Sequence, residues 1–203
     1  MDESKREGVS RLLSLILRHK PERFELELDA QGYALIDEIL DAVQQKYADL
    51  TEDGLLEVIN GQERRRFEIK DNLVRARYGH SFAIDLGLPP VVPPEFLYFA
   101  GTPAQLRMIV TDGLKPGDRQ YVHLSTSEET ASGIASSRTE TPIVFRIHAA
   151  EAAVAGVRFY DRMPVYLTAE VPPAFIEVPQ DQLSGRSPLY GRQKRLKTPR
   201  RTA

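Results

Sequence analysis

The sequence predicts an α+β protein whose two folded blocks are joined by a proline-rich connector. Four prolines lie within residues 86–95, and proline lacks a backbone donor and restrains its predecessor, so this stretch is extended. Apolar residues before it recur with helical spacing, whereas short strand-like segments alternate with short helices after it. We therefore expect a first lobe at 1–85, a connector at 86–95, a second lobe at 96–180 and a basic tail at 181–203.

The first helix is expected to begin near Ser4, because Ser4 and Glu7 have the spacing of a capping box. Apolar residues follow at helical spacing: Val9, Leu12, Leu13, Ile16 and Leu17. Pro21 limits this helix, so Arg18 and His19 are predicted at its C-terminal end, where cations are favoured by the helix dipole.

Two more helices and a hairpin are predicted in the first lobe. Apolar spacing favours a helix over 36–43, and Thr51 can cap a third helix. Residues 66–70 alternate like a strand, and residues 73–77 can return beside them. Three helices followed by a hairpin is the order of a winged helix, a common nucleic-acid-binding module.

The second lobe is predicted to hold a mixed or largely antiparallel sheet. Thr102 is a suitable N-cap for a helix that Gly113 ends, and another short helix follows Ser127. Neither a GxGxxG nor a GxxxxGK[ST] pattern is present, so a Rossmann unit or a P-loop is not expected. The predicted strands are 96–99, 121–124, 143–147, 157–160, 165–168 and 175–178.

Composition limits the class of protein. The chain has 203 residues, 41% hydrophobic and 28% charged, as in ordinary globular proteins. The absence of cysteine excludes disulfides, thiolate zinc sites and a cysteine nucleophile. No apolar run is long enough to span a membrane or resembles a signal peptide, so a cytoplasmic protein is expected.

The charge is distributed unevenly along the chain. From Arg186 onward there are seven basic residues and no acidic one, which leaves the first 185 residues with a net charge of −9 although the whole chain carries −2. Either an anionic partner such as RNA or a merely solvated tail explains this asymmetry.

Two arginine clusters are candidates for binding phosphate. Arg18 supplies a fork of donors, and His19 beside it can exchange a proton near neutral pH. Arg64, Arg65 and Arg66 repel one another at the entry to a strand unless an anion compensates their charge. Both clusters are equally compatible with a solvated surface.

Two further segments combine small polar residues with histidine. The Gly79–Ser81 segment has the composition of a turn. His123 and Ser125 share one face of a predicted strand, with Arg119 just before it, and this pattern suits either a structural histidine or a site. The four histidines are scattered, so no metal site is expected.

Several strings, in order, resemble the RNA 2′-phosphotransferase family, known as KptA in bacteria. They are LSLILRHK at 13–20, GYALIDEIL at 32–40, RRFEI at 65–69, GHS at 79–81, LYFAGT at 97–102, GLKPGDRQYVHLS at 113–125, FY at 159–160 and VYLTAEVPPAFI at 165–176. The resemblance spans about residues 4–178, which is nearly the whole chain except the tail.

This resemblance implies a winged-helix lobe for RNA and a lobe with the ADP-ribosyltransferase fold for NAD. In the family, the RNA 2′-phosphate attacks the anomeric carbon of the nicotinamide ribose and expels nicotinamide. The ribose 2″-hydroxyl then attacks the phosphorus, which releases RNA with a free 2′-hydroxyl and ADP-ribose 1″,2″-cyclic phosphate.

The resemblance also implies the site residues. The family's Arg-His-Arg-Arg tetrad matches Arg18, His19, Arg66 and Arg119. Contacts to NAD are implied for Gly101, Thr102, His123, Ser125 and Arg138. Two strings depart from the family pattern, both in the NAD lobe: LYFAGT, where the family often has LYHGT, and MPVYLT, where it has NGVWLT.

The expected protein is therefore an NAD-dependent RNA 2′-phosphotransferase, a monomer that needs no metal and no membrane. Two alternatives stay open. One is an ADP-ribosyltransferase that uses the same cleft, modifies nucleic-acid terminal phosphates and stops after the first step. The other is a non-catalytic RNA-binding module.

Overall fold

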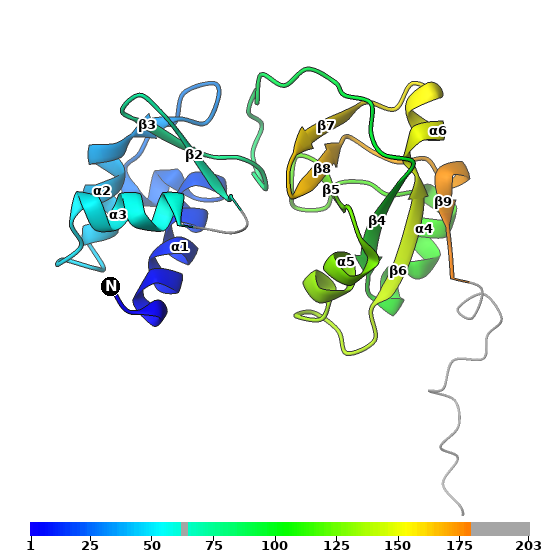
Figure 1. Cartoon of the computed structure of the whole chain (residues 1–203), viewed down its shortest axis with the longest axis horizontal. Coiled ribbons are helices and arrows are strands. Elements are labelled where there is room, and N and C mark those ends of the chain that lie inside the picture. The colour runs from blue at the N-terminus through cyan, green and yellow to red at the C-terminus, as the bar shows by residue number, and fades with distance from the viewer. Residues whose placement is uncertain (62–64, 180–203) are drawn as a thin grey trace, which may run out of the picture.

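Figure 1 shows a computed structural model of the chain, which describes residues 1–61 and 65–179. Two lobes lie side by side, and a connector crosses between them at the top of the view. The predicted basic tail and Arg64 lie outside the described residues. The lobe boundaries at residues 85 and 95 stay a prediction, although the irregular segment between the two sheets agrees with them.

The N-terminal lobe packs three helices against a small sheet. The helices are α1 (Glu3–Arg18), α2 (Ile36–Gln44) and α3 (Glu52–Asn60), and a 3-10 turn, η1 (Pro21–Phe24), follows α1. The strands β1 (Ala34–Leu35), β2 (Phe67–Lys70) and β3 (Leu73–Ala76) are antiparallel in the order β1-β3-β2. The helices bury their apolar faces in one core that includes Leu13, Leu17, Ile39, Leu55 and Val74.

The first helix begins earlier than its sequence predicts. Asp2 is its N-cap, and the Asp2 carboxylate accepts from the Lys5 backbone N–H at 2.8 Å. The prediction that Ser4 and Glu7 form the cap is therefore wrong: an acidic cap two residues upstream satisfies the first free N–H groups. The cap predicted for α3 is confirmed, since the Thr51 hydroxyl accepts from the Gly54 N–H at 3.2 Å.

The C-terminal lobe is built on six antiparallel strands in the order β7-β8-β5-β4-β6-β9. The strands are β4 (Phe96–Gly101), β5 (Val122–Ser125), β6 (Ile143–His148), β7 (Phe159–Arg162), β8 (Val165–Thr168) and β9 (Ile176–Glu177). Helices α4 (Leu106–Asp112), α5 (Glu128–Ala135) and α6 (Ala149–Val154) lie around this sheet, with the 3-10 turns η2 (Pro103–Gln105) and η3 (Pro173–Phe175) (Figure 1).

Most strands of this lobe were predictable from apolar alternation, but several details were not. The strand predicted over 157–160 is β7, shifted by two residues, because α6 occupies the preceding segment and Gly156 turns the chain at φ 100°. Neither α6 nor the short strand β1 was expected. The predicted stop of the helix at Gly113 is confirmed, and this residue has φ 81°.

A third apolar cluster joins the lobes. Tyr78, Ile84 and Leu86 from the segment after β3 pack with Val165 and Leu167 of β8. The connector therefore contributes side chains to a core shared by both lobes, which fixes the surfaces that face each other across the junction.

Candidate functional site

Arg18 ends α1 and is partly buried among aromatic rings. Its guanidinium carbon lies 5.7 Å from the centroid of Phe67 and 5.0 Å from that of Tyr78. Its Nη2 donates to the Arg66 carbonyl at 3.4 Å. These contacts hold the cation at the lobe junction, and an aromatic face stabilises a cation without neutralising its charge.

Arg66 immediately precedes β2 and is tied to α1. Its Nη1 donates to the hydroxyl of Ser10 at 3.1 Å, and its carbonyl accepts from the Arg77 N–H at 2.9 Å. Arg65, next to it, is exposed and adopts φ 36°. The strand entry therefore brings Arg66 to the end of α1, 48 residues away from Arg18 in sequence.

Arg119 reaches the same place from the C-terminal lobe, in the loop before β5. The pKa of Arg18 is lowered to about 10, chiefly by burial and also by the cations of Arg66 and Arg119, while Tyr78 opposes the shift. Burial also lowers the pKa of Arg119, with Arg138 adding to the effect. Crowded like charges favour a bound anion, because it relieves their mutual repulsion.

His19 completes this group. Its pKa is lowered from 6.5 chiefly by burial and also by Arg18 and Arg119, while Asp118 opposes the shift. The imidazole is therefore mostly neutral at pH 7 and able to accept a proton. The structure thus brings together all four predicted tetrad residues.

His123 and Ser125 lie on β5, and Ser125 is buried opposite Tyr98 of β4. The Nδ1–H of His123 donates to the carbonyl of Tyr121 at 2.9 Å, because a carbonyl can only accept. Its Nε2 is buried and has no hydrogen-bond partner among the described residues. Burial, with Arg119 and Arg18, lowers the pKa of His123 to about 3.

Gly101 and Thr102 lie at the end of β4, next to β5. A Cβ at Gly101 would come within 3.1 Å of the Gln105 Oε1 and 3.3 Å of the Phe99 ring. The Thr102 N–H donates to the Gln105 Oε1 at 2.9 Å and so begins the 3-10 turn η2. Arg138 is exposed in the turn after α5, and its influence on the pKa of Arg119 places it near the tetrad.

Sequence reasoning missed the residues that connect the two halves of this site. The Gln120 N–H, next to Arg119, donates to the His80 carbonyl at 2.8 Å. The side-chain amide of Gln120 donates to the Ile84 carbonyl at 2.9 Å and accepts from the Ile84 N–H at 3.3 Å. Tyr78 lies against Arg18 and meets the His123 ring edge-on at 6.0 Å. Nothing in the local sequence signals these contacts between lobes.

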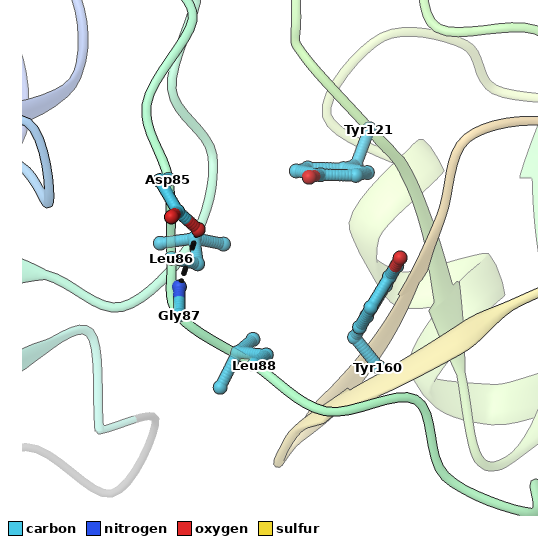
Figure 2. A pocket seen from close by; sticks show the side chains of 6 residues that line it. All are labelled: Asp85, Leu86, Gly87, Leu88, Tyr121 and Tyr160. Atoms are coloured by element: carbon cyan, nitrogen blue, oxygen red, sulfur yellow. Dashed lines mark hydrogen bonds between the residues drawn. The ribbon is translucent and has the colours of Figure 1, made fainter.

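A small cavity of about 90 Å³ lies at the junction but outside this site. It is lined by Asp85 at the end of the first lobe, by Leu86, Gly87 and Leu88 of the connector, and by Tyr121 and Tyr160. Figure 2 shows the connector on one side and the two tyrosines on the other. None of the predicted site residues lines the cavity, so we do not assign it to the reaction.

Within residues 1–61 and 65–179, no group of three or more His, Asp or Glu residues is arranged to hold a metal ion. In the same part of the chain, no helix has the length and apolar character needed to cross a membrane.

Residues 4–170 match the model of the family described as RNA 2′-phosphotransferase, Tpt1/KptA. The chain belongs to this family. The family resemblance predicted from the sequence is therefore confirmed. The chain is an RNA 2′-phosphotransferase, an enzyme of the transferase class.

Curated relatives cover most of the chain. A probable RNA 2′-phosphotransferase of Hahella chejuensis is 37% identical over 179 residues, covering 87% of this chain and 96% of the relative. One of Bacillus thuringiensis is 36% identical, covering 84% and 94%. One of Methanosarcina barkeri is 31% identical, covering 89% of this chain and 87% of the relative.

Proposed function

We propose that the enzyme removes an internal 2′-phosphate from RNA with NAD as the acceptor. The products are RNA with a 2′-hydroxyl, nicotinamide and ADP-ribose 1″,2″-cyclic phosphate. The N-terminal lobe serves as a winged-helix RNA module and the C-terminal lobe as an ADP-ribosyltransferase-like module for NAD.

The clustering of three guanidinium groups around Arg18, with the neutral imidazole of His19 beside Arg18 and Arg119, carries this proposal. Arg18, Arg66 and Arg119 come from three separate segments, and Arg66 and Arg119 both lie close enough to Arg18 to lower its pKa. Such a cluster suits a dianionic phosphate, and charge-assisted hydrogen bonds from several arginines both hold and orient it. His19 is available to accept or return a proton during transfer of the phosphoryl group.

The residues of the second lobe fit a dinucleotide. The unpartnered His123 Nε2 offers a buried acceptor. Gly101 lets the end of β4 pack closely against Gln105, which holds the turn that begins at Thr102. Arg138 supplies positive charge suited to a pyrophosphate, beside Arg119. NAD, when bound, supplies a ribose carbon whose nicotinamide is a good leaving group.

The surroundings of the three tetrad arginines and of two residues in the second lobe suggest a role for each. Arg18 and Arg66 are linked to each other and to α1, so we assign them to binding the RNA phosphate. Arg119 lies between this pair and Arg138, so we assign it to the phosphate where it meets the ribose. Ser125, buried on β5, and Thr102, at the end of β4, are assigned to positioning NAD.

The test is to incubate the enzyme with NAD and a short RNA that carries one internal 2′-phosphate, and to identify every product. RNA with a free 2′-hydroxyl together with ADP-ribose 1″,2″-cyclic phosphate is expected. Unchanged RNA would contradict the proposal and favour a binding module. Accumulation of ADP-ribosylated RNA would instead indicate a transferase that stops at the first step.

A further inference from the structure

The turn at Gly79–Ser81 folds back onto the end of α1. Gly79 has φ 92°, and a Cβ there would lie 3.4 Å from both Cδ and Nη1 of Arg18. The Ser81 N–H donates to the Arg18 carbonyl at 2.9 Å. The turn therefore lies against Arg18, and a backbone hydrogen bond that does not involve the Ser81 side chain ties it to the end of α1.

The Ser81 side chain makes two hydrogen bonds of its own. Its Oγ donates to the Arg18 carbonyl at 3.2 Å and lies 3.1 Å from the Nδ1 of His19. In the Arg18 contact the hydroxyl is the donor, so its single proton is directed at the carbonyl, which can only accept. With the proton there, the Ser81 Oγ is left to accept from the Nδ1–H of His19.

This pair of bonds determines which ring nitrogen of His19 carries the proton. A neutral imidazole has one N–H, and the Ser81 contact places it on Nδ1. Nε2 is left with a lone pair, and no hydrogen bond among the described residues engages it.

We propose that Ser81 is a positioning residue of the phosphotransfer reaction, because it holds His19 as the Nδ1–H tautomer and keeps Nε2 free to accept a proton. The catalytic part of this inference rests on the proposed function, whereas the tautomer does not. The charged groups around His19 are Arg18 and Arg119, which disfavour its protonation, and Asp118, which favours it. The neutral form that the tautomer describes is therefore the relevant one near pH 7.

Three variants separate this role from a structural one. Ser81→Ala removes the hydroxyl but retains the backbone bond to the Arg18 carbonyl, and Ser81 is exposed, so the fold is expected to survive. Ser81→Thr keeps a hydroxyl. Ser136→Ala is the matched control, because the Ser136 hydroxyl also donates to a carbonyl at a helix end, that of Ser132 at 2.9 Å, with no histidine involved.

The first measurement is ¹⁵N NMR of protein labelled at histidine, with the His19 signals assigned from a His19→Gln variant. At pH 7.5 the wild type, Ser81→Thr and Ser136→Ala are expected to show His19 as the Nδ1–H tautomer, and Ser81→Ala to show a shift toward Nε2–H. An Nε2–H tautomer in the wild type, or an unchanged tautomer in Ser81→Ala, would overturn the proposal.

The second measurement is single-turnover removal of the RNA 2′-phosphate at saturating NAD. Ser81→Ala is expected to be slowed by about three- to tenfold, the fold-change that the loss of one hydrogen bond of typical net strength produces. The KM for NAD should stay the same, and Ser81→Thr should restore the rate. An unchanged rate in Ser81→Ala, despite an altered tautomer, would remove the catalytic role.

The two measurements also distinguish this inference from the proposed function. If the wild type does not use NAD to remove the phosphate, the proposed reaction fails, and the catalytic role of Ser81 fails with it. The NMR result still decides whether Ser81 sets the tautomer of His19.

Discussion

Arg119 shares its surroundings with Arg138 and Arg18, and this crowding makes a bound phosphate favourable. We expect Arg119→Ala to lower kcat/KM by about 100- to 1,000-fold, which is the effect of removing one preorganised, positively charged hydrogen-bond donor. Its melting temperature should change little, because removing Arg119 relieves repulsion. Arg107→Ala, an exposed arginine on α4, is the control and should keep full activity. Normal turnover in Arg119→Ala would contradict the assignment of the tetrad.

His80 gives the fold a specific sensitivity to acid. Its side chain is 2% exposed, and burial, together with Arg18 and Arg75, lowers its pKa from 6.5 to about 3. Between these values the unfolded chain binds a proton that the folded protein does not, so the free energy of unfolding falls as the pH falls. The slope is at most about 1.4 kcal/mol per pH unit from this residue.

The His80→Phe variant tests this sensitivity. Phenylalanine keeps an aromatic ring against Phe82, which His80 meets edge-on at 5.7 Å, but it cannot be protonated. Urea unfolding at pH 7 and pH 4.5 should show a smaller loss of stability in the variant than in the wild type. An equal loss in both proteins would show that His80 does not contribute to the acid sensitivity.

At the scale of an element, the start of α1 distinguishes two possible caps. Asp2 makes the observed capping bond, so Asp2→Ala should lower the free energy of unfolding by about 1 kcal/mol. Ser4→Ala, two residues later and inside the helix, should change it by much less. Thermal unfolding of the two variants gives the comparison, and a larger effect at Ser4 would restore the cap that the sequence alone predicts.

Two glycines, one at the end of a helix and one inside a helix, should change stability in opposite directions when replaced by alanine. Gly113 ends α4 with φ 81°, and a Cβ there would lie 2.3 Å from the backbone oxygen of Val171. Gly133 lies inside α5 with nothing within 4 Å of such a Cβ. Gly113→Ala is expected to lower the free energy of unfolding by more than about 2 kcal/mol, and Gly133→Ala to raise it by about 0.5–1 kcal/mol. Denaturant unfolding of both variants tests the pair, and a stable Gly113→Ala would mean that the backbone at Val171 can move.

At the scale of the whole molecule, Glu68 of β2 connects the two lobes. It accepts from Arg75 of its own hairpin at 2.6 Å and from Arg162 of β7 at 3.1 Å, and both arginines are buried. Removing the carboxylate leaves two buried cations without a compensating charge. Glu68→Gln should therefore cost about 3 kcal/mol of stability.

The control for Glu68 is a carboxylate in an exposed ion pair within one lobe. Glu57 pairs with Arg6 on the surface, so Glu57→Gln should change stability by less than about 1 kcal/mol. Loss of the Glu68 contact should also loosen the junction, so that unfolding followed by two probes, one in each lobe, ceases to coincide. Coincident, unshifted transitions in Glu68→Gln would argue that the apolar junction core holds the lobes together without this pair.

Local sequence alone was enough to predict most elements of this fold. Apolar periodicity placed α1, α2, α3 and the strands of the large sheet, and Thr51 and Gly113 marked element ends by side-chain and backbone preferences that act over a few residues. It could not predict β1, two residues long, because that strand exists only through its pairing with β3. The tetrad residues were found through an ordered family resemblance, not through any single local pattern.

The sequence by itself determined the residue types that chemistry requires, namely arginines, a histidine and a glycine turn, together with the family to which the chain belongs. Only the tertiary structure decided that the Ser81 hydroxyl meets the His19 ring and that Gln120 bonds to the carbonyl of His80. The first contact joins residues 62 apart, and the second joins the two lobes. Local preferences act over a few neighbours, whereas the first contact depends on the packing of the turn at Ser81 against the end of α1. The second depends on how the shared core at Tyr78 and Leu167 orients one lobe against the other.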